Sequence, residues 1–403
     1  MLASIVNTFA NCFKIPELKS RILFTLLLLA ICRLTAIVPI PGLDGSVLKA
    51  FFDQQAAKSG SSSLLGMYSM FTGGALERCA IGALGIMPYI SATIIIQLLT
   101  AVVPSLSKLA REEGGRPKII QYGRYLTVLL CLGQGLVMAL GWEHPEKVFQ
   151  AQLPGPLVLV GPPWWYLVQT TLILTTGTML LMWLGEQITD RGIGNGVSLV
   201  ITIGILARLP QAGQALKEMF FPPAGTESHF NLFHAVALVL LLFAVVAGVV
   251  AVTQAQRKIP VQYAQRTVGR KSYAGTSSFM PLRVNYAGVM PIIFAQAILM
   301  FPDKVFNVLG RSLNLPFLIG IGQRFREGEP LYLIIYGAMI LFFSYFWVAT
   351  QFNELQISDD LKKYGGYIPG VRPGQATSNY LHNAMSRITL AGGIFLTIIA
   401  IIP

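Results

Sequence analysis

Long apolar runs separated by short polar segments are the dominant pattern of this sequence. A helix that crosses a bilayer needs about 20 mostly apolar residues. Six runs meet this requirement, at 22–38, 80–103, 125–141, 164–184, 232–253 and 331–350. Three further runs are shorter or are interrupted by Gly or Pro, at 196–209, 284–301 and 387–402. Hydropathy alone therefore predicts six to nine membrane spans.

The charged residues between the runs reduce this range. Residues 104–124 carry five Lys or Arg against two acidic residues, and residues 254–283 carry six and no acidic residue. Each Lys or Arg costs about 2.5 to 3.5 kcal/mol at the membrane centre, so both loops are expected in the cytosol. An even number of spans must then separate them, which makes 196–209 a span. The same argument favours 284–301. We therefore expect nine spans and a cytosolic N-terminus.

The composition agrees with a polytopic membrane protein. Of the 403 residues 54% are hydrophobic and only 12% are charged, and the mean hydropathy is +0.61. A soluble domain carries about a quarter charged residues. These values exclude a disordered chain, a nucleic-acid-binding domain and an ordinary cytosolic enzyme. The four cysteines form no CxxC pair and are expected to be buried rather than to bind a metal or form disulfides; they are Cys12, Cys32, Cys79 and Cys131.

A short apolar segment, LLGMYSMFTGGAL at 64–76, follows a flexible SGSSS joint at 59–63. At about 13 residues it is too short to cross a bilayer. Gly73 and Gly74 separate it from the next helix. The segment either packs into the protein as a re-entrant element or lies on the surface as a helix, and hydropathy does not distinguish the two.

Catalytic motifs are absent from the sequence. It contains no HExxH, no GxSxG and no phosphate-binding loop, so we expect neither an enzyme nor a cofactor. The spans are nearly free of acidic residues, and Arg33 is the one charge inside a long run, where snorkelling or a bond to backbone is the ordinary explanation. Ile86, Ile90 and Ile94 recur every four residues on one helix face. This stripe is either a lipid-facing or packing surface, or an apolar constriction in a channel.

Long strings of the chain resemble the SecY family, the central subunit of the bacterial Sec protein-conducting channel. They include MFTGGALERCAIGALGIMPYISATIIIQLL at 70–99, GTMLLMWLGEQITDRGIGNGVS at 177–198, QRKIPVQYAQRTVGRKSYAG at 256–275, PLRVNYAGVMPIIFAQAILMFP at 281–302 and FNELQISDDLKKYGGYIPGVRPG at 352–374. Matching strings of this length do not arise by chance.

The resemblance implies an all-α membrane protein of two pseudo-symmetric halves, at 1–210 and 211–403. SecY proteins have ten spans and a cytosolic tail, whereas nine spans are expected here. The resemblance therefore implies either a piece of a longer product or a channel that lacks its tenth span.

The resemblance also assigns roles to residues. The plug corresponds to about 64–76, with Leu64, Met67, Met70, Phe71, Gly73 and Gly74. The pore ring corresponds to Ile86, Ile90, Val197, Ile201 and Ile293. The lateral gate corresponds to Gln97 and Asn285. In the family, the cytosolic loops contact SecA and the ribosome, and these loops correspond to about 254–283 and 353–382. The contact positions correspond to Arg270, Lys271 and Arg372. For these three basic residues, a role in fixing topology alone is the alternative.

The implied function is conduction of unfolded secretory proteins across the bacterial plasma membrane, with release of membrane helices sideways into lipid. The implied partners are SecE, SecG, the SecA ATPase, the ribosome, polypeptides that carry signal sequences, and membrane lipids. A secondary transporter with broken helices is the first alternative, and the lack of intramembrane carboxylates argues against it. An intramembrane protease is the second, and no catalytic pair falls within the spans.

Overall fold

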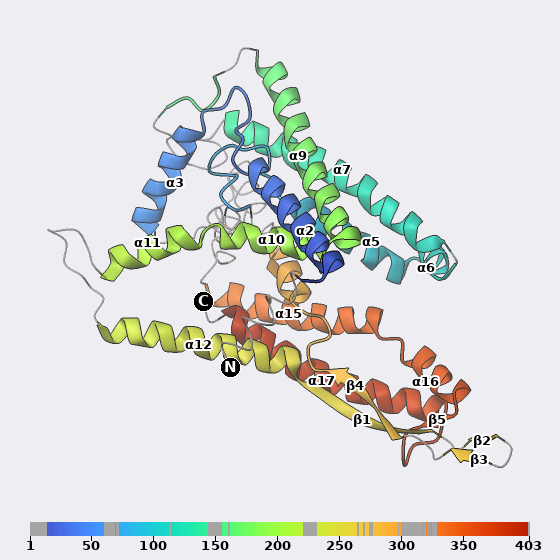
Figure 1. Ribbon diagram of the computed structural model, residues 1–403. Coiled ribbons are helices and arrows are strands. Elements are labelled where there is room, and N and C mark those ends of the chain that lie inside the picture. The colour runs from blue at the N-terminus through green and yellow to red at the C-terminus, as the bar shows by residue number, and fades with distance from the viewer. Residues whose placement is uncertain are drawn as a thin grey trace. The chain divides into compact units, whose positions relative to one another are not determined.

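Figure 1 shows the chain as a computed structural model, coloured from blue at the N-terminus to red at the C-terminus. The structure describes residues 14–59, 69, 72–112, 114–143, 155–159, 162–220, 232–263, 266–268, 271–273, 277–296, 298, 299, 317, 320, 322, 324 and 329–401. The chain divides into two compact units, Met1–Glu227 and Ser228–Pro403. The two pseudo-symmetric halves expected at 1–210 and 211–403 stay a prediction.

The first unit is built from helices. They are α2 (Pro16–Thr35), α3 (Gly45–Ser59), α5 (Met87–Val102), α6 (Pro104–Arg111), α7 (Gly115–Glu143), α9 (Pro163–Arg191), α10 (Gly196–Leu206) and α11 (Leu209–Phe220). Helix α9 packs against α7, α10 and α2, and α5 packs against α7. Helices α2, α5, α6 and α9 each have proline in the first turn, where a missing N–H leaves no intrahelical bond unmade.

The span predicted at 80–103 is wrong at its start, because residues 80–86 form turns and α5 follows them. These turns are bonded to the end of α2, where the Gly82 N–H donates to Thr35 O at 2.9 Å. Gly85 has a φ of +60°, in the left-handed region, and a helix cannot continue through that conformation. Contacts with a distant segment therefore delay the start of the helix.

The core of the first unit lies where the segment after α2 meets α7 and α9. Its fully buried side chains include Ile40, Leu76, Leu84, Trp142 and Leu174. The burial predicted for the cysteines is confirmed for Cys32, Cys79 and Cys131. Cys12 lies outside the described residues.

The second unit combines helices with small antiparallel sheets. The helices include α12 (Leu232–Gln254), α15 (Pro330–Gln351), α16 (Glu354–Lys363) and α17 (Gln375–Ile401). Strands β1 (Gln256–Tyr263), β4 (Ser277–Arg283) and β5 (Gly366–Tyr367) form a sheet in the order β4-β1-β5, with Gln256 opposite Arg283. Strands β2 (Arg266–Val268) and β3 (Lys271–Tyr273) pair as a separate hairpin.

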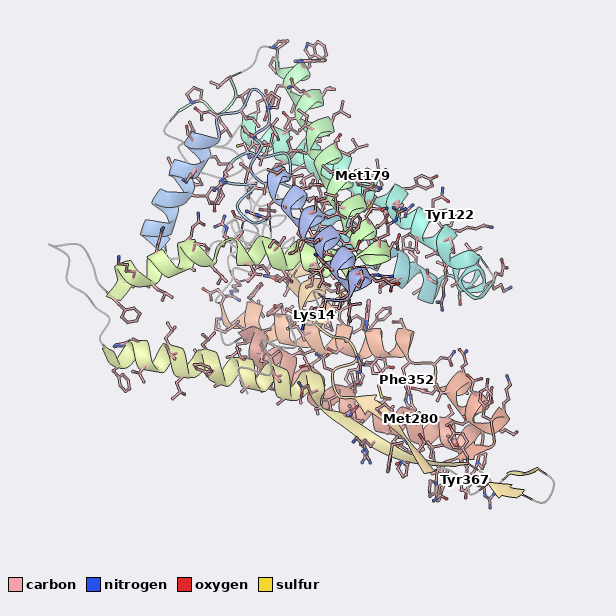
Figure 2. All side chains as sticks on the ribbon, in the orientation of Figure 1. Lys14, Tyr122, Met179, Met280, Phe352 and Tyr367 are labelled. Carbon is pink, nitrogen blue, oxygen red and sulfur yellow. The ribbon has the colours of Figure 1, made fainter. Side chains whose placement is uncertain are left out.

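The basic loop expected at 254–283 is therefore a folded hairpin. Ile259 and Val261 of β1 are buried while their neighbours are exposed, which is the period-two pattern of a strand with one covered face. Ile259 and Phe352 belong to one buried apolar cluster, and Met280 packs against it. Phe352 and Met280 are labelled in Figure 2. The buried face of the sheet holds the basic hairpin to the helical part of this unit.

Among the described residues, six helices are long and apolar enough to cross a membrane. A seventh results if α5 and α6, which meet at an angle of 103°, are counted as one span. The run expected at 196–209 belongs to a longer candidate span, Gly196–Lys217. The run at 284–301 is described only in part. The protein is thus a largely helical membrane protein, and the count of nine spans stays a prediction.

Candidate functional site

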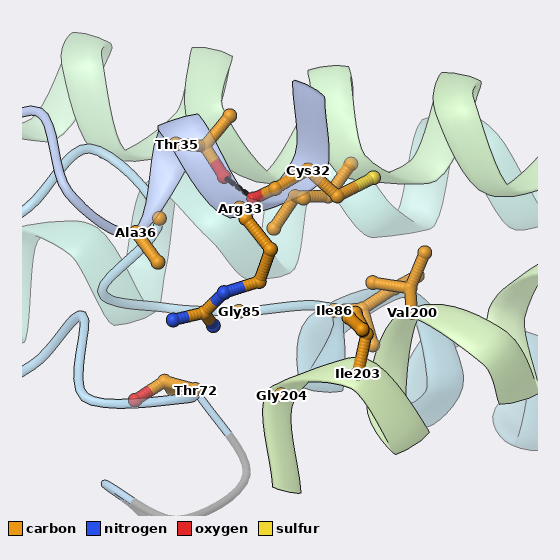
Figure 3. A pocket seen from close by; sticks show the side chains of 12 residues that line it. Cys32, Arg33, Thr35, Ala36, Thr72, Gly85, Ile86, Val200, Ile203 and Gly204 are labelled. Carbon is orange, nitrogen blue, oxygen red and sulfur yellow. Dashed lines mark hydrogen bonds between the residues drawn. The ribbon is translucent and has the colours of Figure 1, made fainter. Parts of the chain in front are cut away.

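A small cavity lies inside the first unit, between α2, α9, α10 and the turns before α5. Its volume is about 30 Å³, which suits water rather than an organic substrate. It is lined by Cys32, Arg33, Thr35, Ala36, Thr72, Gly82, Gly85, Ile86, Leu181, Val200, Ile203 and Gly204. Figure 3 shows the Arg33 side chain reaching toward Gly85, while Ile86, Val200 and Ile203 gather to one side.

Two of the predicted ring residues, Ile86 and Ile90, lie one turn apart at the start of α5. Their exposed fractions are 5% and 6%, and Ile86 also lines the cavity. A stripe that faces lipid would leave these side chains exposed in the isolated chain. The lipid-facing interpretation is therefore wrong for Ile86 and Ile90, and packing and constriction remain.

The predicted ring residues of the fifth span, Val197 and Ile201, are half-buried on α10. They share a face of the helix with Val200 and Gly204, because residues three and four apart lie one above the other. Val200 and Gly204 line the cavity together with Ile86. The structure thus brings the start of α5 and the ring face of α10 to the same cavity.

A tight turn between α9 and α10 determines where that face lies. Asn195 caps α10, since its Oδ1 accepts the Ser198 N–H at 3.2 Å. Thr189 Oγ1 accepts the Gly196 N–H at 2.9 Å. A Cβ at Gly196 would collide with Gly185 O, so only glycine lets the two helices approach this closely. The string GEQITDRGIGNG is therefore a close connection between helices.

A polar cluster joins Ser69 and Glu77 to Arg208, which lies between α10 and α11. Arg208 Nη2 forms an ion pair with Glu77 Oε1 at 2.5 Å and also donates to Ser69 Oγ. Ser69 Oγ in turn donates to Glu77 Oε1 at 2.9 Å. The side chains of Arg208 and Glu77 are only 18% and 15% exposed. Removal from water strengthens such a pair and makes the loss of one partner costly.

The glycine pair at the end of the predicted plug lies between two arginines. Arg33 Nη2 donates to Gly73 O at 3.3 Å, which confirms that Arg33 is bonded to backbone. Gly73 and Gly74 have φ values of +64° and +86°, in the left-handed region that favours glycine. A Cβ at Gly73 would lie 3.1 Å from Gly204 Cα, and one at Gly74 would lie 3.3 Å from Arg208 Nη2.

The rest of the predicted plug is described only in part. Leu64, Met67, Met70 and Phe71 lie outside the described residues. Of the described ones, Ser69, Thr72, Ala75 and Leu76 are buried. Residues 72–76 form turns rather than a helix. This end of the segment therefore packs into the first unit, as expected of a re-entrant element and not of a helix on the surface.

The remaining ring and gate residues belong to different units. Gln97 is exposed on α5 of the first unit. In the second unit, Asn285 is half-buried after β4, and Ile293 is half-buried in a helical stretch at 290–296. The closure of the ring by Ile293 and the pairing of Gln97 with Asn285 stay predictions.

The predicted contact residues lie on the hairpin and on the turn before α17. Lys271 is in β3, and Arg270 lies outside the described residues. Arg372 is exposed, and its backbone O accepts the Thr377 Oγ1–H at 2.9 Å. The side chain of Ser358 donates to Gly374 O at 2.7 Å. The GVRPG turn is thus held to α16 and α17 while Arg372 points into solvent.

Sequence reasoning missed Ser69, Glu77 and Arg208. Arg208 and Ser69 lie 139 positions apart in the sequence. The residues around Arg208 form no motif, so the sequence carries no local signal that the two side chains meet. Within the described part of the chain, no cluster of three His, Cys, Asp or Glu residues could hold a metal ion. The chemistry of this region is therefore that of packing, hydrogen bonds and one ion pair.

Comparison with known proteins identifies the family. The family model described as SecY matches residues 80–403, well over half of the chain. The chain belongs to the SecY family. Membership makes it a subunit of a protein-conducting channel rather than an enzyme.

Relatives within the SecY family extend over nearly the whole chain. The protein translocase subunit SecY of Escherichia coli strain K12 is 43% identical over 389 residues, which are 96% of this chain and 84% of that protein. The subunit of the same name from Thermotoga maritima is 39% identical over 400 residues, which are 98% of this chain and 87% of that protein. The resemblance to the SecY family drawn from the sequence is thereby confirmed.

Solved structures show the same fold at low identity. The structure of a protein conducting channel matches with a TM-score of 0.56 and 17% identity, over 95% of this chain and 85% of that one. The idle yeast Ssh1 complex bound to the yeast 80S ribosome matches with a TM-score of 0.57 and 14% identity, over 95% and 84%. At these identities the likeness supports the SecY-type fold.

Proposed function

We propose that this chain forms the pore of a bacterial Sec translocon in the plasma membrane, with its N-terminus in the cytosol. It conducts unfolded secretory proteins across the membrane and releases apolar helices sideways into lipid. The observation that carries the proposal is the SecY match over 80–403 together with bacterial relatives at 39% to 43% identity. Those relatives are translocase subunits by name.

The proposed constriction consists of Ile86, Ile90, Val197, Ile201 and Ile293. Aliphatic side chains can close around a passing chain without making directional bonds, and a narrow apolar ring excludes water and ions by dewetting. The burial of Ile86 and Ile90, and the cavity that Ile86 shares with α10, support this role. Residues 64–76 act as the plug, and Gln97 and Asn285 act at the lateral gate.

The proposed partners are SecE and SecG within the complex, and SecA and the ribosome at the cytosolic loops. The hairpin at 254–283 carries six basic residues and no acidic residue. Ribosomal RNA is a polyanion, so a basic hairpin is expected to bind it with a strong dependence on salt. Arg372 is exposed on a turn that a hydrogen bond holds in place, which supports a second contact with SecA or the ribosome within 353–382. The yeast Ssh1 complex, a fold neighbour of low identity, was solved bound to the yeast 80S ribosome.

A disulfide crosslink tests the pore. Ile90→Cys is made in a chain whose native cysteines are replaced by alanine, and the chain is reconstituted with SecE, SecG and SecA in proteoliposomes. A secretory precursor with one cysteine is stalled during translocation, and an oxidant is added. We expect a disulfide that requires both ATP and a signal sequence.

The matched control is Leu129→Cys on the outer side of α7, where the side chain is 67% exposed. It is expected to give no crosslink. A precursor that crosses the membrane without a bond to Cys at position 90, or with equal bonding at position 129, would show that the pore is assigned to the wrong residues.

A further inference from the structure

The small cavity of the first unit has one charged group in its wall, the guanidinium of Arg33. Arg33 is half-buried near the end of α2. Its guanidinium lies near Gly85, apart from the aliphatic side chains of Ile86, Val200 and Ile203 (Figure 3). A positive charge therefore faces a cavity whose other walls are neutral.

The charge of Arg33 is not balanced by a carboxylate. Among the described residues, no acidic side chain lies within ion-pair distance of it. The charged groups that act on Arg33 are Arg78 and Arg208, which have the same sign. Glu77, the acidic residue of this region, is already paired with Arg208. The region thus carries more positive than negative charge, and a partly buried charge without a partner is unfavourable.

Arg33 also keeps unused hydrogen-bond donors. A guanidinium has five N–H groups, and the described bond of this side chain is the one to Gly73 O at 3.3 Å. The two hydroxyl groups in the wall already donate to backbone, Thr35 Oγ1 to Cys32 O at 2.8 Å and Thr72 Oγ1 to Ser69 O at 3.1 Å. The donors left for a bound molecule therefore belong to Arg33.

The start of α5 adds to the positive potential. Ile86 lines the cavity and is the N-cap residue of this helix of 16 residues. Its side chain has no oxygen that could accept an N–H of the first turn. The N-terminus of a helix carries a partial positive charge, which favours a nearby anion. This effect supplements the charge of Arg33.

The size of the cavity limits what can bind. Its volume of about 30 Å³ exceeds the 10 to 15 Å³ that one water molecule needs. A halide is a single atom somewhat larger than water, whereas phosphate and carboxylates have several heavy atoms. The aliphatic walls favour an anion that gives up its hydration readily, and a guanidinium is itself weakly hydrated.

We propose that this cavity is a halide site, in which chloride binds to the Arg33 guanidinium between α2, α10 and the turns before α5. The inference is independent of the pore assignment, because it concerns the charge balance inside the first unit. A ligand that binds the folded state and not the unfolded state stabilises the fold by mass action. Chloride should therefore stabilise the first unit in a saturable way.

The test measures thermal unfolding of the full chain in detergent micelles. Sodium chloride replaces sodium gluconate at constant ionic strength, since gluconate is too large for the cavity. The wild-type melting temperature should rise by about 2 to 5 °C at a chloride concentration tenfold above the dissociation constant, and then level off. Bromide should act like chloride. Sulfate, which stabilises proteins by exclusion from their surface, should act equally on wild type and on every variant.

Two variants remove the site in different ways. Arg33→Gln removes the charge, and Ala36→Leu keeps the charge but fills the cavity, which Ala36 lines. Both are expected to lose the chloride-dependent shift. The matched control is Arg124→Gln, because Arg124 already has a carboxylate partner, Glu186, at 3.1 and 2.8 Å. This control removes an arginine from the same unit and is expected to keep the wild-type shift.

The outcomes distinguish a halide site from a cavity that holds water only. Equal melting of the wild type in chloride and in gluconate would mean water only and would overturn the proposal. An unchanged chloride shift in Arg33→Gln or Ala36→Leu would place the effect elsewhere and would also overturn it. Anomalous diffraction from wild-type crystals grown in bromide requires no variant to fold. A peak beside the Arg33 guanidinium is expected, and its absence would contradict the site.

Discussion

Gly177→Ala is expected to destabilise the protein, although alanine is the better helix former. Gly177 lies inside α9 and faces the turns at 80–86. A Cβ at this position would collide with Ile81 O and lie 2.7 Å from Ile81 Cγ2. Ile81 cannot withdraw freely, because its N–H donates to Val38 O at 3.0 Å. The added methyl group must therefore displace the backbone of residues 80–86 or push α9 away.

Opposing effects set the size of the change. Alanine gains about 1 kcal/mol over glycine inside a helix. Overpacking costs about 1 to 3 kcal/mol, and a backbone contact places this site at the upper end. Breaking the Ile81 to Val38 hydrogen bond costs about 1 kcal/mol more. The free energy of unfolding should fall by about 2 kcal/mol if that bond survives and by about 3 kcal/mol if it breaks.

Gly133→Ala on α7 is the matched control. A Cβ at Gly133 would meet none of the described atoms within 4 Å, so the helix preference of about 1 kcal/mol should appear alone as a gain. Both variants are measured by unfolding in mixed micelles against wild type. The two should differ by about 3 to 4 kcal/mol, on the order of a hundredfold or more in the unfolding constant. Equal stability of the two variants would refute the close packing of α9 on residues 80–86.

Three further predictions concern caps, charge and helix approach. Asn195→Ala should lower the free energy of unfolding by about 1 kcal/mol through loss of the α10 cap, while Asn195→Asp should stay close to wild type, and equal losses would contradict the capping role. The Ser46 hydroxyl and N–H hold the pKa of Asp44 below its usual range, so the stabilisation of the start of α3 is present above the ordinary Asp pKa and is lost as the pH falls through the lowered one. Hydrogen exchange at the start of α3 should show this loss in wild type and not in Asp44→Ala. Gly196→Ala should destabilise the protein for the same reason as Gly177→Ala, by about 1 to 3 kcal/mol, and an unchanged melting curve would contradict the close α9–α10 turn.

Most of the spanning helices could be predicted because the signal is local. The apolar runs at 125–141, 164–184, 232–253 and 331–350 lie within α7, α9, α12 and α15. In each of them a run of about 20 apolar residues is itself the physical requirement for a helix that crosses a bilayer. Where the requirement was not local, the prediction failed. Residues 80–86 are apolar, yet they form turns because their backbone groups bond to the end of α2.

The basic hairpin shows an intermediate case. The charges of 254–283 correctly set this segment apart from the spans, whereas the strands were not predicted. The alternation of Ile259 and Val261 with polar neighbours was a usable signal for β1. Its pairing with β4 and β5 depends on segments up to about a hundred residues away, as in the 105 residues between Gln262 and Tyr367. Strand pairing over such separations is decided by the fold.

By itself, the sequence determined the class of this protein, its SecY family, most of the apolar spans and the two basic segments that lie outside them. These follow from composition, run length and long matching strings, which do not require knowledge of where distant residues lie. Only the tertiary structure brought Arg33 and Arg208 to the two sides of the Gly73–Gly74 turn and placed Glu77 beside Arg208. An ion pair or a close approach of backbones is a property of distance in space. That distance depends on how α2, α9 and α10 pack, and no spacing along the chain encodes it.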